Sequence, residues 1–300
     1  MESVQSALAP HGPGAAITAE IAWVLFLGGG LVFLLVMALA AWAAFGRRRE
    51  WLAGGTALIA GGVVFPIVVL FALLVYTLLA AARIADAHGA PALRIEVVGE
   101  QWWWRVHYLD ETGGRDFATA NELRIPVGRT VEVELRSADV LHSFWVPALA
   151  GKLDLIPGRT NRLRFRADRP GVFRGQCAEY CGGPHAQMAF HVVAEEEAEF
   201  ERWRAGQRAP AGGANELFLA RCAACHAVRG TPAAGTLGPD LTHAGSRLAI
   251  GAGILPNDAG AIAAWITASQ RIKPGNLMPE FHDLGGAELG ALAAYVASLR

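Results

Sequence analysis

The sequence predicts a multi-domain membrane protein in three parts: a two-helix transmembrane hairpin, a β-sandwich or barrel, and an all-α C-terminal domain. Two apolar runs, 21–45 and 56–82, contain no charged residue or histidine and predict the hairpin. Short alternating segments between 93 and 194, separated by Gly and Pro turns, predict the β domain. Helical periodicity toward the end of the chain predicts the third part. The 300 residues are enough for these parts.

The hairpin is expected over residues 19–90, after an N-terminal extracytoplasmic segment, 1–18. Each apolar run exceeds the roughly 20 residues that cross a bilayer, and glycines and Pro66 are tolerated in membrane helices. Arg47, Arg48 and Arg49 fill the loop between the runs, so the positive-inside rule predicts a cytoplasmic loop and two extracytoplasmic ends. A cleaved signal peptide is the alternative for the first run, but it lacks a basic leader and is too long.

The β domain is expected over residues 91–205. Val131, Val133 and Leu135 alternate with charged residues, which predicts a strand with one buried and one exposed face. Several antiparallel strands of this kind predict a sandwich or barrel. A charged, helical segment follows at 195–204, and a linker rich in Gly, Ala and Pro at 206–214. The net charge of −1 and the lack of a basic tract outside the arginine loop give no support for nucleic-acid binding.

The segment from Cys177 to Met188 places two thiols, the His185 imidazole and a thioether within twelve residues. Such soft ligands favour copper. Two cysteines four residues apart can bridge two metals if a second imidazole is available, and His142 supplies one from a separate strand-like segment. The alternative is a Cys177–Cys181 disulfide in an exported domain, with the histidines and Met188 as packing residues.

These segments closely resemble subunit 2 of cytochrome c oxidase, and the resemblance covers residues 15 to 204. The matching stretches are 97–108, 139–147, 152–161 and 175–188. The resemblance implies a cupredoxin-like fold and a dinuclear copper centre of the CuA type. In this centre Cys177 and Cys181 bridge the coppers, His142 and His185 are the imidazole ligands, and Met188 completes one copper.

The same resemblance implies that the backbone carbonyl of Glu179 completes the other copper and that its side chain reaches a magnesium ion at a subunit interface. It also implies that Trp102 is the residue through which the electron enters. An ordinary surface carboxylate is the alternative for Glu179. Trp104 is expected in the core; the roles of Trp103 and Asp154 stay open.

The C-terminal domain, 215–300, contains the C-x-x-C-H signature of covalent c-type haem attachment. Cys222 and Cys225 would form the thioethers, His226 would bind the iron, and Met278 is placed to be the sixth ligand. The domain resembles a class I cytochrome c. A redox dithiol or zinc half-site is the alternative for the cysteines, although no second cysteine pair exists for zinc, and core packing is the alternative for Met278.

Together these features predict subunit 2 of a bacterial cytochrome c oxidase in the cell (inner) membrane, with both redox domains on the periplasmic side. We expect it to pass electrons from a cytochrome c or upstream complex to the haem of catalytic subunit 1, where dioxygen is reduced to water and protons are translocated. The two apolar runs contain no histidine that could hold haem and copper in the membrane, so this chain is not expected to be the oxygen-reducing subunit.

Two rival functions stay open: electron delivery for nitric oxide or nitrous oxide reduction, and copper assembly or storage. Many family members carry a glutamate near the start of the second membrane helix that serves proton uptake. The run 52–70 has no acidic residue, and Glu50 is not equated with it. A role of this chain in proton uptake is therefore undecided.

Overall fold

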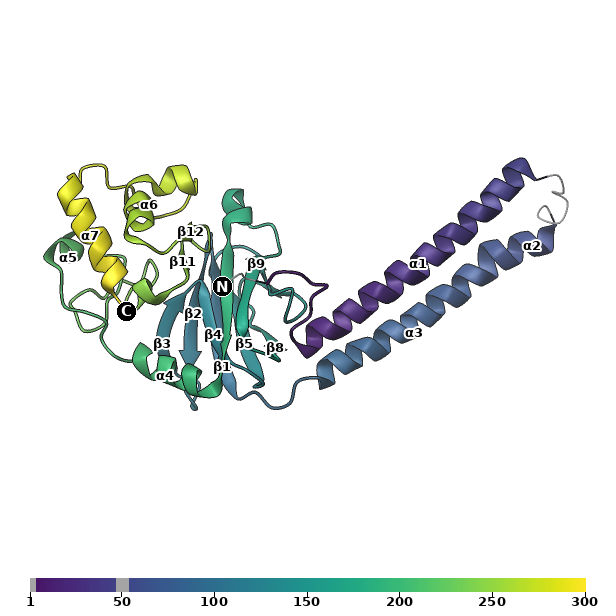
Figure 1. Ribbon diagram of the computed structural model, residues 1–300, viewed down its shortest axis with the longest axis horizontal. Coiled ribbons are helices and arrows are strands. Elements are labelled where there is room, and N and C mark those ends of the chain that lie inside the picture. Colours follow the sequence, from purple (N-terminus) through teal and green to yellow (C-terminus); the bar gives the residue numbers. More distant parts are fainter. Residues whose placement is uncertain (1–3, 47–53) are drawn as a thin grey trace.

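A computed structural model describes residues 4–46 and 54–300. Its first part is a long helical hairpin, which lies on the opposite side of a β-sandwich from the C-terminal helical domain (Figure 1). This arrangement confirms the predicted fold class of a two-helix hairpin, a sandwich and a helical domain. Arg47–Arg49 and Glu50, on which the orientation of the hairpin and the proton-uptake question depend, lie outside the described residues.

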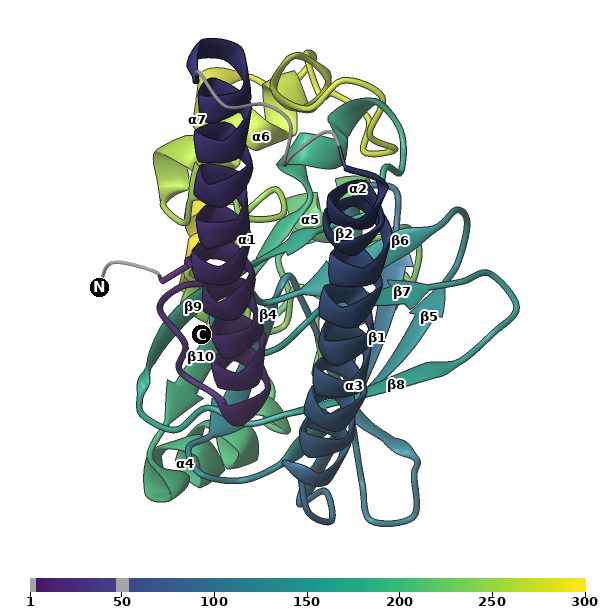
Figure 2. The same ribbon diagram turned by 90° about the vertical axis from the view of Figure 1, so that its right-hand side faces the viewer.

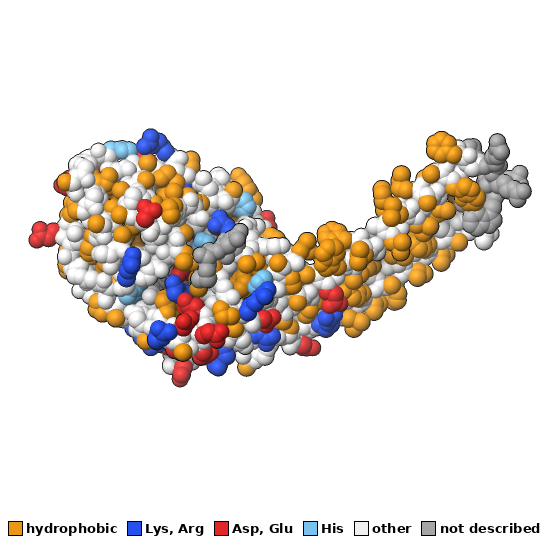
Figure 3. Space-filling model, in the orientation of Figure 1, with side chains coloured by type: hydrophobic (Ala, Val, Ile, Leu, Met, Phe, Trp, Pro, Cys, Tyr) orange, Lys and Arg blue, Asp and Glu red, His pale blue; other side chains and the backbone are white. Residues whose placement is uncertain are grey.

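The hairpin is formed by α1 (Pro13–Phe45) and by a second helix that runs through α2 (Gly55–Ile59), η1 (Ala60–Val64) and α3 (Phe65–Asp86). Both helices are long and apolar enough to cross a membrane. They run side by side (Figures 1 and 2), and their surface is covered by apolar side chains (Figure 3). The π-helical turn η1 ends two residues before Pro66, whose missing N–H interrupts the α-helical hydrogen-bond ladder.

The two helices are joined near the sandwich by a pair of charges. Arg83 donates two hydrogen bonds to the Glu20 carboxylate, at 2.8 and 3.0 Å, and Tyr76 donates a third. The segment before α1 packs back onto the sandwich, where Val4 bonds to Val172 and Arg174, and His11 to Ala148. The segment from Val4 to the start of α1 therefore lies at the same end of the hairpin as the sandwich.

The sandwich consists of two five-stranded sheets, in the orders β3-β2-β1-β5-β8 and β4-β10-β9-β6-β7. Within the first sheet β1 and β5 are parallel, and in the second β4 and β10 are parallel, so the pairing is mixed and not antiparallel throughout. The strands are β1 (Leu93–Glu100), β2 (Trp103–Leu109), β3 (Arg115–Ala120), β4 (Glu122–Pro126), β5 (Val131–Ser137), β6 (His142–Trp145), β7 (Leu153–Leu155), β8 (Asn161–Phe165), β9 (Gly171–Cys177) and β10 (Ala189–Glu195).

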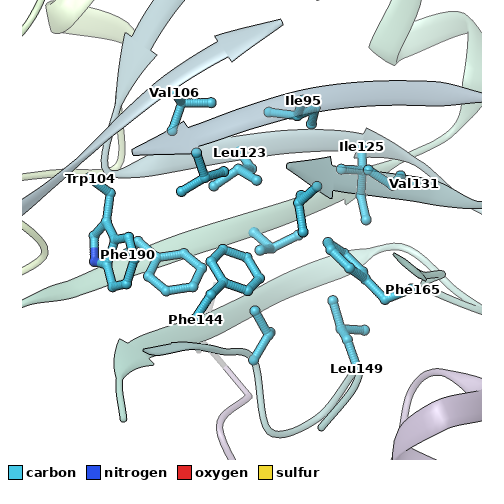
Figure 4. Close-up of a cluster of buried hydrophobic side chains, with 14 of the residues drawn as sticks. Ile95, Trp104, Val106, Leu123, Ile125, Val131, Phe144, Leu149, Phe165 and Phe190 are labelled. Carbon is cyan, nitrogen blue, oxygen red and sulfur yellow. The ribbon is translucent and has the colours of Figure 1, made fainter. Parts of the chain in front are cut away.

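The core between the sheets is aromatic and aliphatic (Figure 4). Trp104 is fully buried as expected, and its ring packs edge-on against Phe144 and Phe190. The prediction that the charged face of 131–135 would be exposed is wrong for Glu132, which is buried. Arg164 from β8 pairs with this carboxylate at 2.7 Å and covers it.

The C-terminal domain follows α4 (Glu197–Gln207), which packs beside β4. It contains α5 (Glu216–Arg221), the 3-10 turn η3 (Ala244–Ser246), a small hairpin of β11 (Ala249–Ile250) and β12 (Leu255–Pro256), α6 (Ala259–Ile272) and α7 (Gly286–Ser298). On α7, Leu292 is buried in the core of the domain, with Leu289 and Val296 packed beside it, as the periodicity predicts.

Candidate metal centre and haem attachment site

The strand pairing of the second sheet explains why residues far apart in sequence meet at one end of the sandwich. His142 begins β6 and Cys177 ends β9, and these strands are antiparallel with Phe144 opposite Cys177. Cys181 lies in the loop that follows, and Met188 directly precedes β10. His142, Cys177 and Met188 are therefore positioned by strand ends. Cys181 and His185 lie in the short loop that contains the 3-10 turn η2 (Gly183–Gln187).

The sulfur and nitrogen atoms of the predicted copper ligands converge. Cys177 Sγ lies 3.8 Å from His142 Nδ1 and 3.8 Å from Cys181 Sγ. Cys181 Sγ lies 3.4 Å from His185 Nδ1 and 3.9 Å from the Met188 sulfur. The three atoms from His142, Cys177 and Cys181 all lie within 4.8 Å of one another, and all three residues are buried. The chain thus brings every predicted sulfur and imidazole ligand to one place.

This donor set fits a pair of soft metal ions better than a disulfide. A disulfide needs the two sulfurs at about 2.0 Å, whereas these two stand 3.8 Å apart as free thiols. Each thiol has its own imidazole; His142, both cysteines and Met188 are buried, and His185 is partly buried. Thiolate, imidazole and thioether together select copper. The Glu179 carbonyl oxygen, 3.2 Å from Cys177 Sγ, adds the predicted backbone ligand.

Contact between the two thiols shifts the pKa of each. The hydrogen bond from Cys181, aided by His142, lowers the pKa of Cys177 to about 3, against the opposing effect of burial. The same sulfur–sulfur contact and burial raise the pKa of Cys181. The two pKa values therefore shift in opposite directions because the sulfur atoms contact each other.

His142 is oriented by a residue that the sequence analysis did not single out. The Nε2 of its ring lies 2.8 Å from Asp139 Oδ1, which leaves Nδ1 directed at Cys177. Burial lowers the pKa of His142, but the hydrogen bonds to Cys177 and Asp139 outweigh it and leave the pKa raised. A carboxylate behind a metal-binding imidazole fixes the orientation of the ring. The i, i+3 spacing of Asp139 and His142 in the sequence could have indicated that the carboxylate supports the imidazole.

The Glu179 side chain does not enter the sulfur cluster. It is partly exposed, and its carboxylate lies 3.4 Å from Lys152 Nζ. The same ammonium lies 3.8 Å from Asp154 and donates to the Ala178 carbonyl. These two carboxylates and Lys152 form an open charged group beside the copper loop.

Trp102 lies against the copper loop and is half buried. Its indole N–H donates a 2.9 Å hydrogen bond to the Cys181 carbonyl, and the Gln101 side chain donates to the same oxygen at 2.7 Å. A methyl group on Gly182 would lie 2.9 Å from the ring, and one on Gly275 of the C-terminal domain would lie 3.4 Å from it. The ring thus lies between the copper loop and the C-terminal domain, close to both. For Trp103, Arg105 stacks over the ring at 4.6 Å.

The haem attachment motif lies directly after α5. The Nδ1 of His226 is 2.8 Å from the Pro239 carbonyl, so this nitrogen carries the proton and Nε2 is free for iron. The segment 238–241 therefore contacts this histidine. Burial raises the pKa of Cys222 to about 11, which keeps this thiol protonated. Gly235 fits against Cys225, since a methyl group there would lie within 2.6 Å of its backbone.

Met278 lies in the loop between α6 and α7, partly buried against the same core as Cys222. Its backbone is held on both sides: its N–H donates to Asn276, and its carbonyl accepts bonds from Ser269 and Gln270 at 3.0 Å. The residues present suit a covalent haem with His and Met ligands.

Comparison with known proteins identifies the families of both domains. Residues 93–195 match the family model "Cytochrome C oxidase subunit II, periplasmic domain", and residues 213–300 match "Cytochrome c". A cytochrome c oxidase subunit 2 from Alkalihalophilus pseudofirmus is 40% identical over 261 residues, which are 82% of this chain and 74% of the relative.

A second relative and one solved structure are also similar to parts of this chain. Cytochrome c oxidase subunit 2 of Bacillus subtilis is 31% identical over 79% of this chain and 73% of its own length. Among solved structures, the periplasmic domain of subunit II from Bradyrhizobium japonicum is 33% identical, with a TM-score of 0.38, over 40% of this chain and 96% of that one.

Proposed function

Because the chain belongs to the cytochrome c oxidase subunit 2 family, we propose that it relays single electrons within a haem-copper oxidase. A haem c on the C-terminal domain receives them from a cytochrome c or an upstream complex. A dinuclear copper (CuA) centre in the sandwich passes them to the haem of the catalytic subunit, which reduces dioxygen to water and translocates protons. We place the complex in the bacterial cell (inner) membrane, anchored by two apolar helices, with both redox domains on the periplasmic side.

The convergence of five donor side chains at the end of the sandwich is the observation that carries this proposal. Copper and haem, when bound, supply one-electron chemistry and no substrate-binding step. Cys177 and His142 sit on paired strand ends, so the protein holds them in place in either oxidation state. A fixed ligand set favours electron transfer over metal delivery, because a storage protein has to release its metal.

A second line of support is the continuity of contacts between the two proposed centres. A methyl group on Gly275, three residues before Met278, would lie 3.4 Å from the Trp102 ring, and the Trp102 N–H donates to the Cys181 carbonyl. These contacts support Trp102 as the point of electron entry into the copper centre. The indole ring of Trp102 is joined to the Cys181 carbonyl directly, by one hydrogen bond.

We also propose a magnesium site at an interface with the catalytic subunit. Glu179 contributes its carboxylate there and its backbone carbonyl to copper. Its side chain is partly exposed and shares Lys152 with Asp154, and carboxylate oxygens are suitable magnesium ligands.

We propose five segments along the chain. They are the N-terminal segment 1–18, the helical hairpin 19–90, the copper domain 91–205, the linker 206–214 and the cytochrome c domain 215–300.

Spectroscopy of the purified complex tests the proposal. We expect the visible spectrum of a low-spin haem c and the electron paramagnetic resonance signal of a mixed-valence copper pair. Cys177→Ser should remove the copper signal and leave the haem spectrum intact. Met278→Leu should leave the copper signal intact, alter the haem spectrum through loss of the sixth ligand, and slow electron transfer from haem to copper. A single copper per chain, or a Cys177–Cys181 cystine in the assembled protein, would contradict the proposal.

Turnover assays separate the rival functions. The complex should consume dioxygen with reduced cytochrome c as donor and should not turn over nitrous oxide or nitric oxide at a comparable rate. Copper should resist a chelator over many turnovers. Rapid, reversible loss to the chelator would instead favour copper storage.

A further inference from the structure

Lys273 is buried where the C-terminal domain meets the sandwich, and none of the roles proposed above uses it. Only 2% of the residue is exposed. Lysine is almost never fully buried without partners, because its ammonium loses its hydration. Burial lowers the pKa of Lys273 to about 7, and no carboxylate is bonded to it among the described residues.

Its partners are three backbone carbonyl oxygens from three separate segments. Nζ donates to Trp102, to Gln187 at 2.9 Å and to Gly251 at 3.2 Å. Trp102 is the proposed entry residue, and Gln187 directly precedes the ligand Met188. The three N–H groups of one ammonium thus join the sandwich to the C-terminal domain at the contact between their proposed redox centres.

Further contacts beside the ammonium depend on the same alignment. The tip of the β11–β12 hairpin is formed by residues 251–253, all three with positive φ. At this tip the Ala252 carbonyl accepts the Ala189 N–H at 3.0 Å, and the Gly253 carbonyl accepts Arg174 at 3.2 Å. Gln187 also donates to the Ile272 carbonyl, next to Lys273. These hydrogen bonds between the two domains therefore form only in one relative position of the domains.

The end of α6 explains how Lys273 comes to point inward. It caps the helix, and Pro274 prevents the helix from continuing. The following glycine, Gly275, has a φ of +85° and lies on the Trp102 ring. One turn of chain therefore places the ammonium on the Trp102 carbonyl and the backbone on the Trp102 ring.

We propose that Lys273 is a positioning residue that seats the C-terminal domain over Trp102, and that the seated domain closes this face to external electron donors. The inference rests on the proposed relay, since it assigns Trp102 as the entry point. The occupant of the Trp102 face is the chain's own C-terminal domain, so a soluble cytochrome has to deliver its electron to that domain and not to Trp102.

Hydrogen exchange in the full-length complex tests the seating without reference to electron transfer. The Ala189 N–H is protected by a carbonyl from the other domain, so its exchange reports on separation of the two domains. Lys273→Met should raise exchange of a peptide containing Ala189 at least tenfold, with haem and copper spectra unchanged. Arg271→Met removes a cation from the exposed surface of α6 and should change nothing. Unchanged exchange in Lys273→Met would overturn the proposal.

Lys273→Gln provides a second, milder variant should the methionine variant not assemble. It keeps two N–H donors but loses the charge and some reach. Exchange at Ala189 should lie between that of the wild type and that of Lys273→Met. Exchange equal to the wild type in this variant as well would overturn the seating role.

Access to Trp102 is tested with a soluble reduced cytochrome. In Met278→Leu, where the haem route is impaired, reduction of copper by this donor should be slow. Adding Lys273→Met should speed it at least tenfold, because the face of Trp102 opens; adding Arg271→Met should not. Faster hydrogen exchange without faster copper reduction would overturn the closure. If no copper signal forms in any variant, the proposed relay fails, while the exchange result still decides the seating.

Discussion

Gly99→Ala is the sharpest test of how the sandwich positions the copper ligands. Gly99 lies in β1 opposite Trp104, with an ordinary extended backbone, so alanine brings no backbone strain. Its new methyl group would lie 2.8 Å from Cδ2 and 3.0 Å from Cγ of the His142 ring. The substitution therefore acts on one ligand and leaves the backbone of the strand alone.

The expected size of the effect follows from these distances. Carbon atoms in contact stand about 3.5 Å apart, so the imidazole has to move by about 0.7 Å. It cannot do so freely, because Asp139 holds Nε2 and Cys177 faces Nδ1. Disturbing the support of a metal-binding histidine weakens metal affinity by about 10–100-fold, or about 1.4–2.8 kcal/mol.

Copper titration against a competing chelator measures this affinity, and the hyperfine pattern of the copper signal reports on the imidazole. Gly183→Ala is the matched control: this glycine lies in the copper loop, yet a methyl group there meets nothing within 4 Å. If Gly99→Ala has the same copper affinity and the same hyperfine pattern as Gly183→Ala, then His142 is not a copper ligand that packs against β1.

Other predictions concern stability. A methyl group on Gly175 would lie 2.2 Å from the Phe190 ring, so Gly175→Ala should lower the free energy of unfolding of the sandwich by about 1–3 kcal/mol, as denaturant titration would show. Burial lowers the pKa of His107 to about 4 from 6.5. Stability from its neutral ring is complete above pH 6.5 and is lost as the pH falls toward 4; His107→Gln should flatten this slope. Asn215 caps α5 by accepting the Phe218 N–H, and Asn215→Ala should destabilise the C-terminal domain by about 1 kcal/mol, measured by its thermal unfolding.

The sequence allowed the three parts and the ligand types to be predicted, because both depend on local pattern. Apolar length predicts a membrane helix whatever lies beside it. The spacing within 177–188 keeps its donors close in any compact loop, since few residues separate them. His142 is different: its nearness to Cys177 depends on the pairing of β6 with β9, which only the resemblance to a family supplied.

The alternation of apolar and polar residues did not predict which strands pair with one another. Alternation shows which side chains of a strand share a face, but it does not show the partner strand. The parallel pairs β1–β5 and β4–β10 join segments more than 30 residues apart, and nothing local distinguishes them from antiparallel ones. Glu132 was predicted wrongly for this reason. Its burial depends on Arg164 of β8, and the alternation does not show that β8 lies beside β5.

Lys273 shows the same limit at the level of domains. A lysine at a helix end before a proline is ordinarily a surface residue that interacts favourably with the helix dipole. Its three carbonyl acceptors belong to segments 22, 86 and 171 residues away, and the backbone carries no sequence signal. Because none of these acceptors is a side chain, exchanging residues at 102, 187 or 251 would not remove the bonds. The seating of the C-terminal domain thus depends on the lysine itself, which makes this position the one where a single substitution separates domain docking from the chemistry of either redox centre.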